Sequence, residues 1–335
     1  MSWQKELAQG FKNPDELLDY LALSPDVMGL SKAAHQAFPM RVPRSFAAKM
    51  IKGKSDDPLL YQVLPISDEI LSTPGYLYDP LQESNQANHR PLPGLLHKYA
   101  SRVLLTATGV CAINCRYCFR RHFEYSANRL GNKELAAIID YIQSDKTIRE
   151  VILSGGDPLL LNDQLLKNII TQIEAIPSVE ILRFHTRVPI VLPQRITPEF
   201  ISLLKNTRLH TICVVHCNHP NELDEQTRAY LLPLREAGTH LLNQSVLLKN
   251  VNDDIDTLCR LSYKLLETGI LPYYLHLLDK VQGAAHFDVE EQKAIELHQE
   301  MREQLPGYLL PRLVREVPGE LSKVPVFAAY PPPKS

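Results

Sequence analysis

Residues 102–279 alternate between two spacings of apolar side chains. Short apolar runs rich in β-branched residues predict strands, and the longer segments between them have the apolar spacing of helices. The predicted strands are "RVLLTATGV", "EVILSGG", "VEILRFHTR", "HTICVVHCN", "HLLNQSVLL" and "LPYYLHLLD". The clearest predicted helices are "NKELAAIIDYIQS", "NDQLLKNIITQIEAI", "NELDEQTRAYLLPLREAG" and "DIDTLCRLSYKLLETG". Because helical crossovers join parallel neighbours, this alternation predicts an α/β fold with six parallel strands.

The continuous apolar character of these strands indicates a sheet that is buried on both faces. Six strand–helix units fall short of the eight that close a full barrel, so we predict a partial, open (β/α)6 barrel. An open doubly wound sheet is the alternative, because periodicity does not distinguish the two topologies. We expect an N-terminal helical and irregular extension, a barrel core and a C-terminal arm. Their predicted bounds are 1–96, 97–304 and 305–335.

The composition narrows the class of protein. The chain has 335 residues, with 36 basic and 38 acidic side chains and a formal net charge of −2. This balance does not favour binding to nucleic acid or to a membrane surface, which needs an excess of positive charge. The sequence predicts neither a signal peptide nor a membrane-spanning segment. We therefore expect a cytoplasmic protein, in which clustered cysteines are more often metal ligands or redox groups than disulfides.

Polar residues follow the predicted strands at their carboxyl ends. The segments "CAINCRYC", "GGD", "HTR", "HCNH", "NQS" and "LLD" lie at or just after the six strands in turn. The carboxyl ends of parallel strands meet at one rim of a barrel, and the active sites of barrel enzymes lie at that rim. Six strands that deliver polar groups to one rim indicate that the protein is an enzyme.

Three of the six cysteines, Cys111, Cys115 and Cys118, lie in the segment "CAINCRYCFRRH". Clustered thiolates bind zinc, copper(I) or iron–sulfur clusters. A structural zinc site needs four ligands, and His122 is the candidate fourth. A cluster of four irons on three thiolates would instead leave one iron without a protein ligand. The segment also contains three cations that suit an anionic substrate at that iron, Arg116, Arg120 and Arg121. Three buried cysteines without a metal are the remaining alternative.

The position of C-x3-C-x2-C directly after the first strand resembles the radical S-adenosylmethionine superfamily. The segment "VILSGGDPL" is similar to its glycine-rich segment, in which Gly155, Gly156 and Asp157 would receive the methionine amino group. Across about residues 35–330, the chain further resembles the lysine 2,3-aminomutase family. The segments that carry this resemblance are "FPMRVPRSF", "HKYASRVLL", "CRYCFRR", "VILSGGDPLL", "RVPIVLPQRIT", "HCNHPNE", "NQSVLLKNVND" and "PYYLHLLDKVQGAAHF". Within that family, the length and tail are most similar to the enzymes that form β-lysine for modification of elongation factor P.

The resemblance implies three cofactors: a [4Fe-4S] cluster on Cys111, Cys115 and Cys118, S-adenosyl-L-methionine, and pyridoxal 5′-phosphate. Lys323 in "EVPGELSKVPV" matches the lysine that binds pyridoxal phosphate, although Gly319 is the only one of the family's usual glycines that remains there. Other residues match contacts to the cofactors or are expected beside them, namely Tyr99, Arg102, Arg187 and Gln244.

The resemblance also implies how a lysine substrate is bound. Arg120 matches the arginine that holds the substrate carboxylate, and Asp279 in "HLLDKVQG" matches one of two carboxylates that bind the ε-ammonium. Glu316 stands at the position of the second, where the family usually has Asp. Further polar residues at the strand ends are expected to line the site; they are His216, His219 and Asn243. The remaining cysteines should pack in the core, since buried free cysteine behaves as a small hydrophobe; they are Cys213, Cys217 and Cys259.

Together these matches predict an isomerase that moves the amino group of L-α-lysine from C2 to C3 and so supplies β-lysine for elongation factor P. The expected partners are lysine, elongation factor P with its lysyl-transferring ligase, and a low-potential electron donor. Catabolic members of the family bind zinc between subunits through cysteines of a C-terminal extension. No cysteine follows Cys259 here, so the resemblance implies no such zinc and a monomer or dimer. The alternatives are a catabolic lysine aminomutase, an aminomutase of another amino acid such as glutamate, and a non-enzymatic iron–sulfur or zinc protein.

Overall fold

A computed structural model of the chain describes residues 2–24, 29–83, 89–123 and 130–327, which fold around one sheet of nine strands. The strands lie in the sheet in the order in which they occur in the chain. Seven consecutive strands run parallel: β2 (Arg102–Thr108), β3 (Glu150–Gly155), β4 (Ile181–Thr186), β5 (His210–His216), β6 (His240–Val246), β7 (Leu271–His276) and β8 (Arg312–Arg315). At the two edges, β1 (Leu95–Tyr99) pairs antiparallel with β2, and β9 (Val324–Pro325) pairs antiparallel with β8.

The strand order decides between the two topologies that periodicity left open. A doubly wound sheet reverses its strand order at a switch point, whereas here each parallel strand pairs with the next one along the chain. The pairing runs from β1 to β9 without closing, so the sheet is a partial, open barrel as predicted. All the predicted strands are present. The prediction missed one further parallel strand, β8, because its four residues "RLVR" lie in an arm that prolines interrupt.

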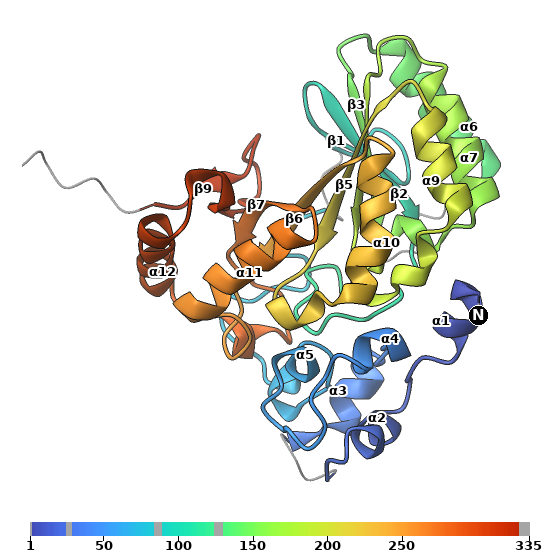
Figure 1. Ribbon diagram of the computed structural model, residues 1–335. Helices are drawn as coiled ribbons and strands as arrows, with labels where there is room; N and C mark the ends of the chain where they lie inside the picture. The colour runs from blue at the N-terminus through green and yellow to red at the C-terminus, as the bar shows by residue number, and fades with distance from the viewer. Residues whose placement is uncertain (1, 25–28, 84–88, 124–129, 328–335) are drawn as a thin grey trace, which may run out of the picture.

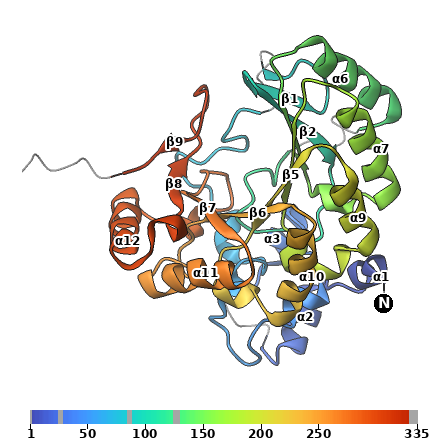
Figure 2. The ribbon, with the colours of Figure 1, turned by 45° about the horizontal axis from the view of Figure 1, so that its top comes forward.

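The helices that connect the parallel strands lie along the outer side of the sheet and form an arc in Figure 2. They are α6 (Asn132–Ser144), α7 (Asp163–Glu174), α9 (Pro198–Asn206), α10 (Glu225–Glu236), α11 (Ile255–Glu267) and α12 (Glu291–Gln304), with the short α8 (Val188–Val191) directly after β4. Asn162, the N-cap of α7, accepts a hydrogen bond from the backbone of Leu165, as capping residues do. The apolar face of α7, which includes Ile169 and Ile173, is buried in the core.

The N-terminal extension, blue in Figure 1, packs against the segments that follow β4 and β5 at their carboxyl ends. Its short helices are α1 (Trp3–Ala8), α2 (Pro14–Tyr20), α3 (Lys32–Ala37), α4 (Arg44–Ala47) and α5 (Pro58–Tyr61). Lys49 ties it to the barrel, because its Nζ donates to Ile190 O at 2.9 Å and to Glu222 O at 2.7 Å. Apolar residues of the extension and of the barrel form one core, so the extension is part of the same folded unit.

Three details of the fold bear on the expectations from the sequence. The bound expected at residue 96 lies inside β1, and the C-terminal arm contributes β8 and β9 to the sheet. The cysteines expected in the core are buried, with exposed fractions of 1% for Cys213, 0% for Cys217 and 8% for Cys259. None of the helices in the described part of the chain is long and apolar enough to cross a membrane.

Candidate active site

The inside of the open barrel holds a cavity of about 550 Å³. It is lined by strands and by the loops at their carboxyl ends, where barrel enzymes have their active sites. Every residue that the sequence indicated as a ligand of the cluster, of a cofactor or of the substrate lines it. These are Tyr99, Arg102, Cys111, Cys115, Cys118, Arg120, Gly155, Gly156, Asp157, Arg187, Gln244, Asp279, Glu316 and Lys323. The fold therefore brings groups from distant parts of the chain into one space.

The loop that carries the three cysteines, residues 109–123, has no helix or strand of its own. The N-terminal extension holds it in place. Arg116 N donates to Gln62 O at 2.9 Å, and Arg41 Nη1 donates to Cys111 O at 3.1 Å. The positions of the thiols thus depend on a part of the chain that precedes the barrel.

Two of the three arginines in this loop anchor it and do not face the cavity. The side chains of Arg116 and Glu69 are both 0% exposed and form an ion pair at 2.5 Å. Arg121 Nη2 donates to the same carboxylate at 2.7 Å. The expectation that these arginines suit an anionic substrate is wrong for Arg116 and Arg121, because a buried carboxylate already compensates their charges. Only Arg120 of the three lines the cavity.

The three thiols form no disulfide and lie close enough for Cys115 and Cys118 to raise the pKa of Cys111, and for Cys115 to raise that of Cys118. Burial raises the pKa of Cys111 well above its usual value and that of Cys118 to about 11, and the neighbouring thiols add to both shifts. Metal binding releases the protons of such thiols. Nearby cations, Arg41 for Cys111 and Arg120 for Cys118, oppose the effect of burial and would compensate thiolates. This donor set fits an iron–sulfur cluster.

The zinc alternative with His122 as the fourth ligand does not fit the structure. His122 Nε2 donates to Gln282 O at 3.1 Å, and His122 does not line the cavity. Across the described ranges up to residue 327, no three His, Cys, Asp or Glu side chains converge on a position for one metal ion. A single zinc needs all its ligands within about 2.3 Å of one point, whereas the thiolates of a cluster bind separate irons.

The turn after β3 lies directly against the start of the cysteine loop. Gly156 N donates to Thr108 O at 2.7 Å. A Cβ atom at Gly155 would lie 2.6 Å from Thr108 O, and one at Gly156 would lie 2.5 Å from Val110 O. Gly155 also has a φ of +114°, which residues with side chains rarely adopt. The close approach of two backbones therefore requires both glycines.

Asp157 connects this turn with the one after β4. Its carboxylate accepts hydrogen bonds from Leu159 N at 3.1 Å, Thr186 Oγ1 at 2.6 Å, Arg187 N at 2.7 Å and Val188 N at 3.1 Å. Burial raises the pKa of Asp157 to about 6, and these hydrogen bonds oppose that shift. Asp157 thus holds the turns after β3 and β4 together, a structural role that the sequence did not predict.

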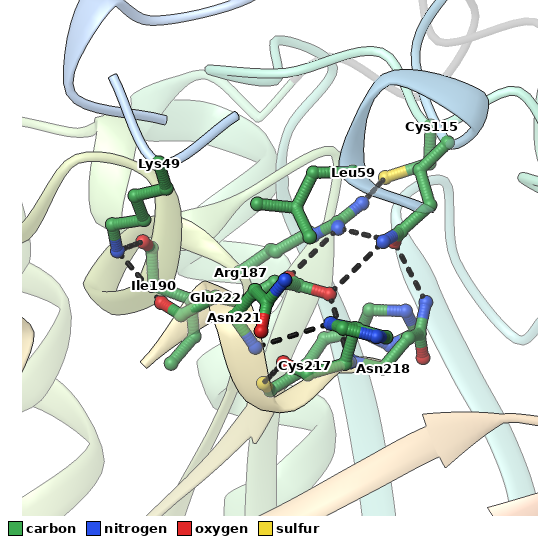
Figure 3. A network of polar contacts seen from close by, with 12 residues as sticks. Lys49, Leu59, Cys115, Arg187, Ile190, Cys217, Asn218, Asn221 and Glu222 are labelled. Carbon is green, nitrogen blue, oxygen red and sulfur yellow. Dashed lines mark hydrogen bonds and ion pairs between the residues drawn. The ribbon is translucent and has the colours of Figure 1, made fainter. Parts of the chain in front are cut away.

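Arg187, at the end of β4, directs its guanidinium to the cysteine loop (Figure 3). Nη1 donates to Cys115 Sγ at 2.7 Å. Nη2 donates to Gln62 Oε1 at 2.7 Å and to Glu222 Oε2 at 3.0 Å. The side chain is 6% exposed. The contact with a cluster thiol differs from the contact with pyridoxal phosphate that the resemblance implied for this residue.

Two carboxylates gather around Lys323 in another part of the cavity. Lys323, on the loop between β8 and β9, forms an ion pair with Glu316. Glu316 Oε2 also lies 3.6 Å from Lys98 Nζ on β1, so this pair bridges the two edges of the open barrel. Burial raises the pKa of Asp279 to about 7, and the negative charge of Glu316 adds to the shift. The charges of Glu316 and Lys323 thus both act on Asp279, the first raising and the second lowering its pKa.

Arg120 has the geometry of a carboxylate ligand. Its Nε and Nη2 donate to the two carboxylate oxygens of Glu83 at 2.8 and 2.7 Å, which is a bidentate arrangement. Nη1 lies 3.4 Å from Ser154 Oγ and from Gly155 O at the end of β3. The expected ligand of the substrate carboxylate therefore lies in the cavity wall next to the glycine turn.

Basic residues line the wall near β1 and the first residues of β2. The guanidinium of Arg102 lies 3.9 Å from the ring centroid of Tyr99. Lys98 and Arg312 also line this part, and Arg183 does so while paired with Glu150. Such a wall suits a phosphate group, because Arg and Lys donate charge-assisted hydrogen bonds to phosphate oxygens.

The expectation that four polar residues of β5, β6 and their ends line the site is right for two of them. His216 and Gln244 line the cavity, but His219 and Asn243 do not. Asn243 Nδ2 donates to Cys217 O at 3.0 Å, and His219 Nδ1 accepts from the backbone of Asn221. Adjacent residues of a strand face opposite sides, so Asn243 and Gln244 on β6 could not both face the cavity.

Several residues that line or support the cavity were not singled out from the sequence, among them Glu222, Lys98, Gln62 and Glu83. Glu222 lies in "HCNHPNE", a segment that carries the family resemblance, so that segment was a usable signal. Lys98 lies next to Tyr99 in a second such segment. Gln62 and Glu83 lie in irregular, proline-containing stretches, where no periodicity or motif marks them.

An open parallel barrel with three cysteines after its first parallel strand and a glycine turn after its second defines an enzyme of the radical S-adenosylmethionine type. The sequence profile of the Radical SAM superfamily matches residues 105–261. Membership of that superfamily implies a [4Fe-4S] cluster and S-adenosylmethionine as cofactors.

Curated relatives identify the family within the superfamily. The chain is 46% identical to the L-lysine 2,3-aminomutase of Escherichia coli over 97% of this chain and 94% of that one. It is 48% identical to the Haemophilus influenzae enzyme over 96% and 94%. It is 36% identical to the Clostridium subterminale enzyme over 98% of this chain and 78% of that one. The chain belongs to the lysine 2,3-aminomutase family and is an isomerase.

Proposed function

We propose that this protein converts L-α-lysine to β-lysine by moving the amino group from C2 to C3. One observation carries the proposal: a single cavity contains the three-cysteine loop, Lys323 and the acid pair Asp279 and Glu316. A radical source, a pyridoxal lysine and a binding site for an ammonium group are what this reaction needs. The alternative of a non-enzymatic iron–sulfur protein explains neither Lys323 nor the acids beside it.

The residues of the cavity divide among the cofactors. Cys111, Cys115 and Cys118 would hold the [4Fe-4S] cluster, and the turn at Gly155 and Gly156 would lie beside S-adenosylmethionine. Pyridoxal 5′-phosphate would be bound by Lys323, with its phosphate near Tyr99 and Arg102 and with Gln244 beside it. The cofactors supply the radical that removes an unactivated hydrogen and the conjugated ring that lets nitrogen move, while the protein supplies their placement.

The charged residues would select lysine by its two ends. Arg120 shows with Glu83 the bidentate geometry that a substrate carboxylate would take. The ε-ammonium would lie between Asp279 and Glu316, because a buried ammonium must be paired. Its arrival favours the ionised form of Asp279, whose pKa is about 7 without it. Glutamate, with a carboxylate at that end, would be repelled by the two acids.

We further propose that the β-lysine serves the modification of elongation factor P. The higher identity to the Escherichia coli and Haemophilus influenzae enzymes, at 46% and 48%, than to the Clostridium subterminale enzyme, at 36%, supports the first two as the nearer subgroup. Mass spectrometry of elongation factor P from cells with and without this gene tests it. Loss of a β-lysyl group on deletion is expected, and an unchanged mass would favour the catabolic alternative.

The proposed reaction is tested by anaerobic reconstitution with iron, sulfide and pyridoxal phosphate, followed by addition of lysine, S-adenosylmethionine and a strong reductant. We expect both chromophores on one chain and β-lysine in the chromatogram. A bound cluster without any pyridoxal on Lys323, and no β-lysine, would contradict the proposal.

A further inference from the structure

We propose that Arg187, Glu222 and Gln62 form a support that presents a cation to the sulfur of Cys115 and thereby makes the cluster bound there easier to reduce. Arg187 provides the contact, and Glu222 and Gln62 are positioning residues that act through it. The inference rests on the proposed function only in that it places the cluster on the three cysteines.

The central contact is the hydrogen bond from Arg187 Nη1 to Cys115 Sγ at 2.7 Å. A guanidinium that donates to a sulfur atom forms a charge-assisted hydrogen bond, which is stronger than one between neutral groups. Figure 3 shows the guanidinium between Cys115 on one side and Glu222 on the other. The positive charge of Arg187 is therefore fixed at one particular ligand of the cluster.

The guanidinium is held from several directions. Nη2 donates to Gln62 Oε1 at 2.7 Å and to Glu222 Oε2 at 3.0 Å. The rings of Phe46 and Tyr117 lie 5.3 and 5.7 Å from its central carbon. At the backbone, Arg187 N donates to the carboxylate of Asp157. With both ends restrained, the side chain has little freedom to leave the sulfur.

Glu222 is held as firmly as the arginine that it supports. Its side chain is 0% exposed. Oε1 accepts hydrogen bonds from Asn218 N at 3.0 Å, His219 N at 3.1 Å and Gln62 Nε2 at 3.1 Å. A buried carboxylate is costly unless it is paired and hydrogen-bonded, and here Arg187 and these donors meet both needs.

Gln62 joins the N-terminal extension to this support. Its Oε1 accepts from Arg187, from Asn218 Nδ2 at 3.1 Å and from Tyr117 Oη at 3.3 Å. Its backbone oxygen accepts from Arg116 N, the residue directly after Cys115. Gln62 therefore fixes both the cysteine loop and the arginine that points to it, although it carries no charge.

The effect on the cluster follows from charge. Reduction adds one electron from an external low-potential donor, and the cluster becomes more negative by one charge. A cation and a hydrogen bond at a ligand sulfur stabilise that added charge more than they stabilise the oxidised state, and hydrogen bonds to the sulfurs are among the factors that set cluster potentials. Arg187 should therefore raise the reduction potential.

The test compares variants by a redox titration of the cluster followed by electron paramagnetic resonance, after iron content has been measured. For Arg187→Gln we expect the ratio of reduced to oxidised cluster at a fixed potential to fall about tenfold, equivalent to about 59 mV for one electron. Gln62→Met changes no charge and should lower the same ratio about threefold, because Arg187 loses a partner. Arg187→Lys keeps the positive charge but loses the planar guanidinium with its several N–H donors. Its ratio of reduced to oxidised cluster should lie between those of the parent and of Arg187→Gln.

Arg195 provides the matched control. Its side chain is 0% exposed, against 6% for Arg187, and it is likewise paired with an acid, Asp163, at 2.8 Å, but it does not line the cavity. Arg195→Gln should lower the thermal stability and leave the potential at the parent value. The inference is overturned if Arg187→Gln and Gln62→Met bind iron and have the potential of the Arg195→Gln protein. If Arg187→Gln does not retain iron, Gln62→Met and Arg187→Lys decide the question. A parent protein that binds no cluster would instead contradict the proposed function.

Discussion

The cysteine loop (residues 109–123) and the β8–β9 hairpin that carries Lys323 face the same cavity but are held in different ways. The loop has no regular structure, yet the ion pair of Arg116 and Glu69, both 0% exposed, anchors it to the extension. Lys323 lies between two short strands, and its neighbour Leu321 is 71% exposed. Regions with few buried contacts open locally at lower cost than buried networks do. Under the proposed function, the cluster would be held in a fixed frame, while the Lys323 side would be able to open for cofactor and substrate.

Removing a cluster ligand should have the largest effect. Cys115→Ala should lose both the iron and all turnover, because three thiolates are the minimum for the cluster and the network around Arg187 would lose its partner. Iron analysis and β-lysine assay measure this. Cys259→Ala, at a buried cysteine outside the cavity, should keep its iron and lose only about 1–3 kcal/mol of stability. Stoichiometric iron and activity in Cys115→Ala would show that the loop does not hold the cluster.

Replacing Lys323 should abolish the function of its own region and leave that of the cysteine loop intact. Lys323→Ala should bind iron and cleave S-adenosylmethionine slowly under reduction, but it should form no β-lysine and lose the pyridoxal absorbance. The exposed Lys133 on α6 serves as a control, and Lys133→Ala should behave as the parent. Borohydride labelling that persists in Lys323→Ala would place the pyridoxal on another residue.

The acid pair should control selectivity for lysine. Asp279→Asn should lower kcat/KM for lysine about a hundredfold, or about 3 kcal/mol, because the ammonium would lose a buried partner. Glu316→Gln should act in the same direction with a smaller effect, since Glu316 is already shared with Lys98 and Lys323. Cluster and pyridoxal contents should not change. If kcat/KM of Asp279→Asn stays within threefold of the parent value, the acid pair does not bind the ε-ammonium of lysine.

Asp279 should also make kcat/KM for lysine fall at low pH. Burial and the charge of Glu316 raise the pKa of Asp279 to about 7. Below that pH Asp279 is protonated in the free enzyme and cannot pair with an ammonium, so kcat/KM should fall about tenfold per unit as the pH is lowered. Profiles of kcat/KM against pH for the parent and for Asp279→Asn test this. If the variant shows the same fall at low pH, a group other than Asp279 causes it.

The smallest effect concerns the glycine turn that lies against the cysteine loop. Gly156→Ala should destabilise the fold by about 1–3 kcal/mol, because the new Cβ would lie 2.5 Å from Val110 O. Gly307→Ala has open space around the new atom and should cost less. Denaturant unfolding of both variants measures the difference. Equal stabilities would mean that the turn can move away from the cysteine loop.

Much of the fold could be predicted from the spacing of apolar residues, because the strands and helices of the barrel have regular spacing. The predicted helix at residues 132–144 coincides with α6 (Asn132–Ser144). The missed β8 shows the limit, since four residues of a proline-interrupted arm have no period to recognise.

The resemblance singled out residues that line the cavity, but it did not predict their contacts. The direction of Arg187 depends on Gln62, which is 125 positions away in the chain, and on Glu222, which is 35 positions away. No local pattern encodes such partners. The misplacement of Asn243 has a different cause, because the two-residue period of β6 already separates it from Gln244.

The most direct measurement uses L-lysine labelled with 15N in the α-amino group. The reconstituted enzyme is incubated anaerobically with this substrate, S-adenosylmethionine and a reductant, and the products are fragmented in a mass spectrometer. The account predicts β-lysine with the 15N on C3. Label that remains on C2 while S-adenosylmethionine is cleaved would contradict it.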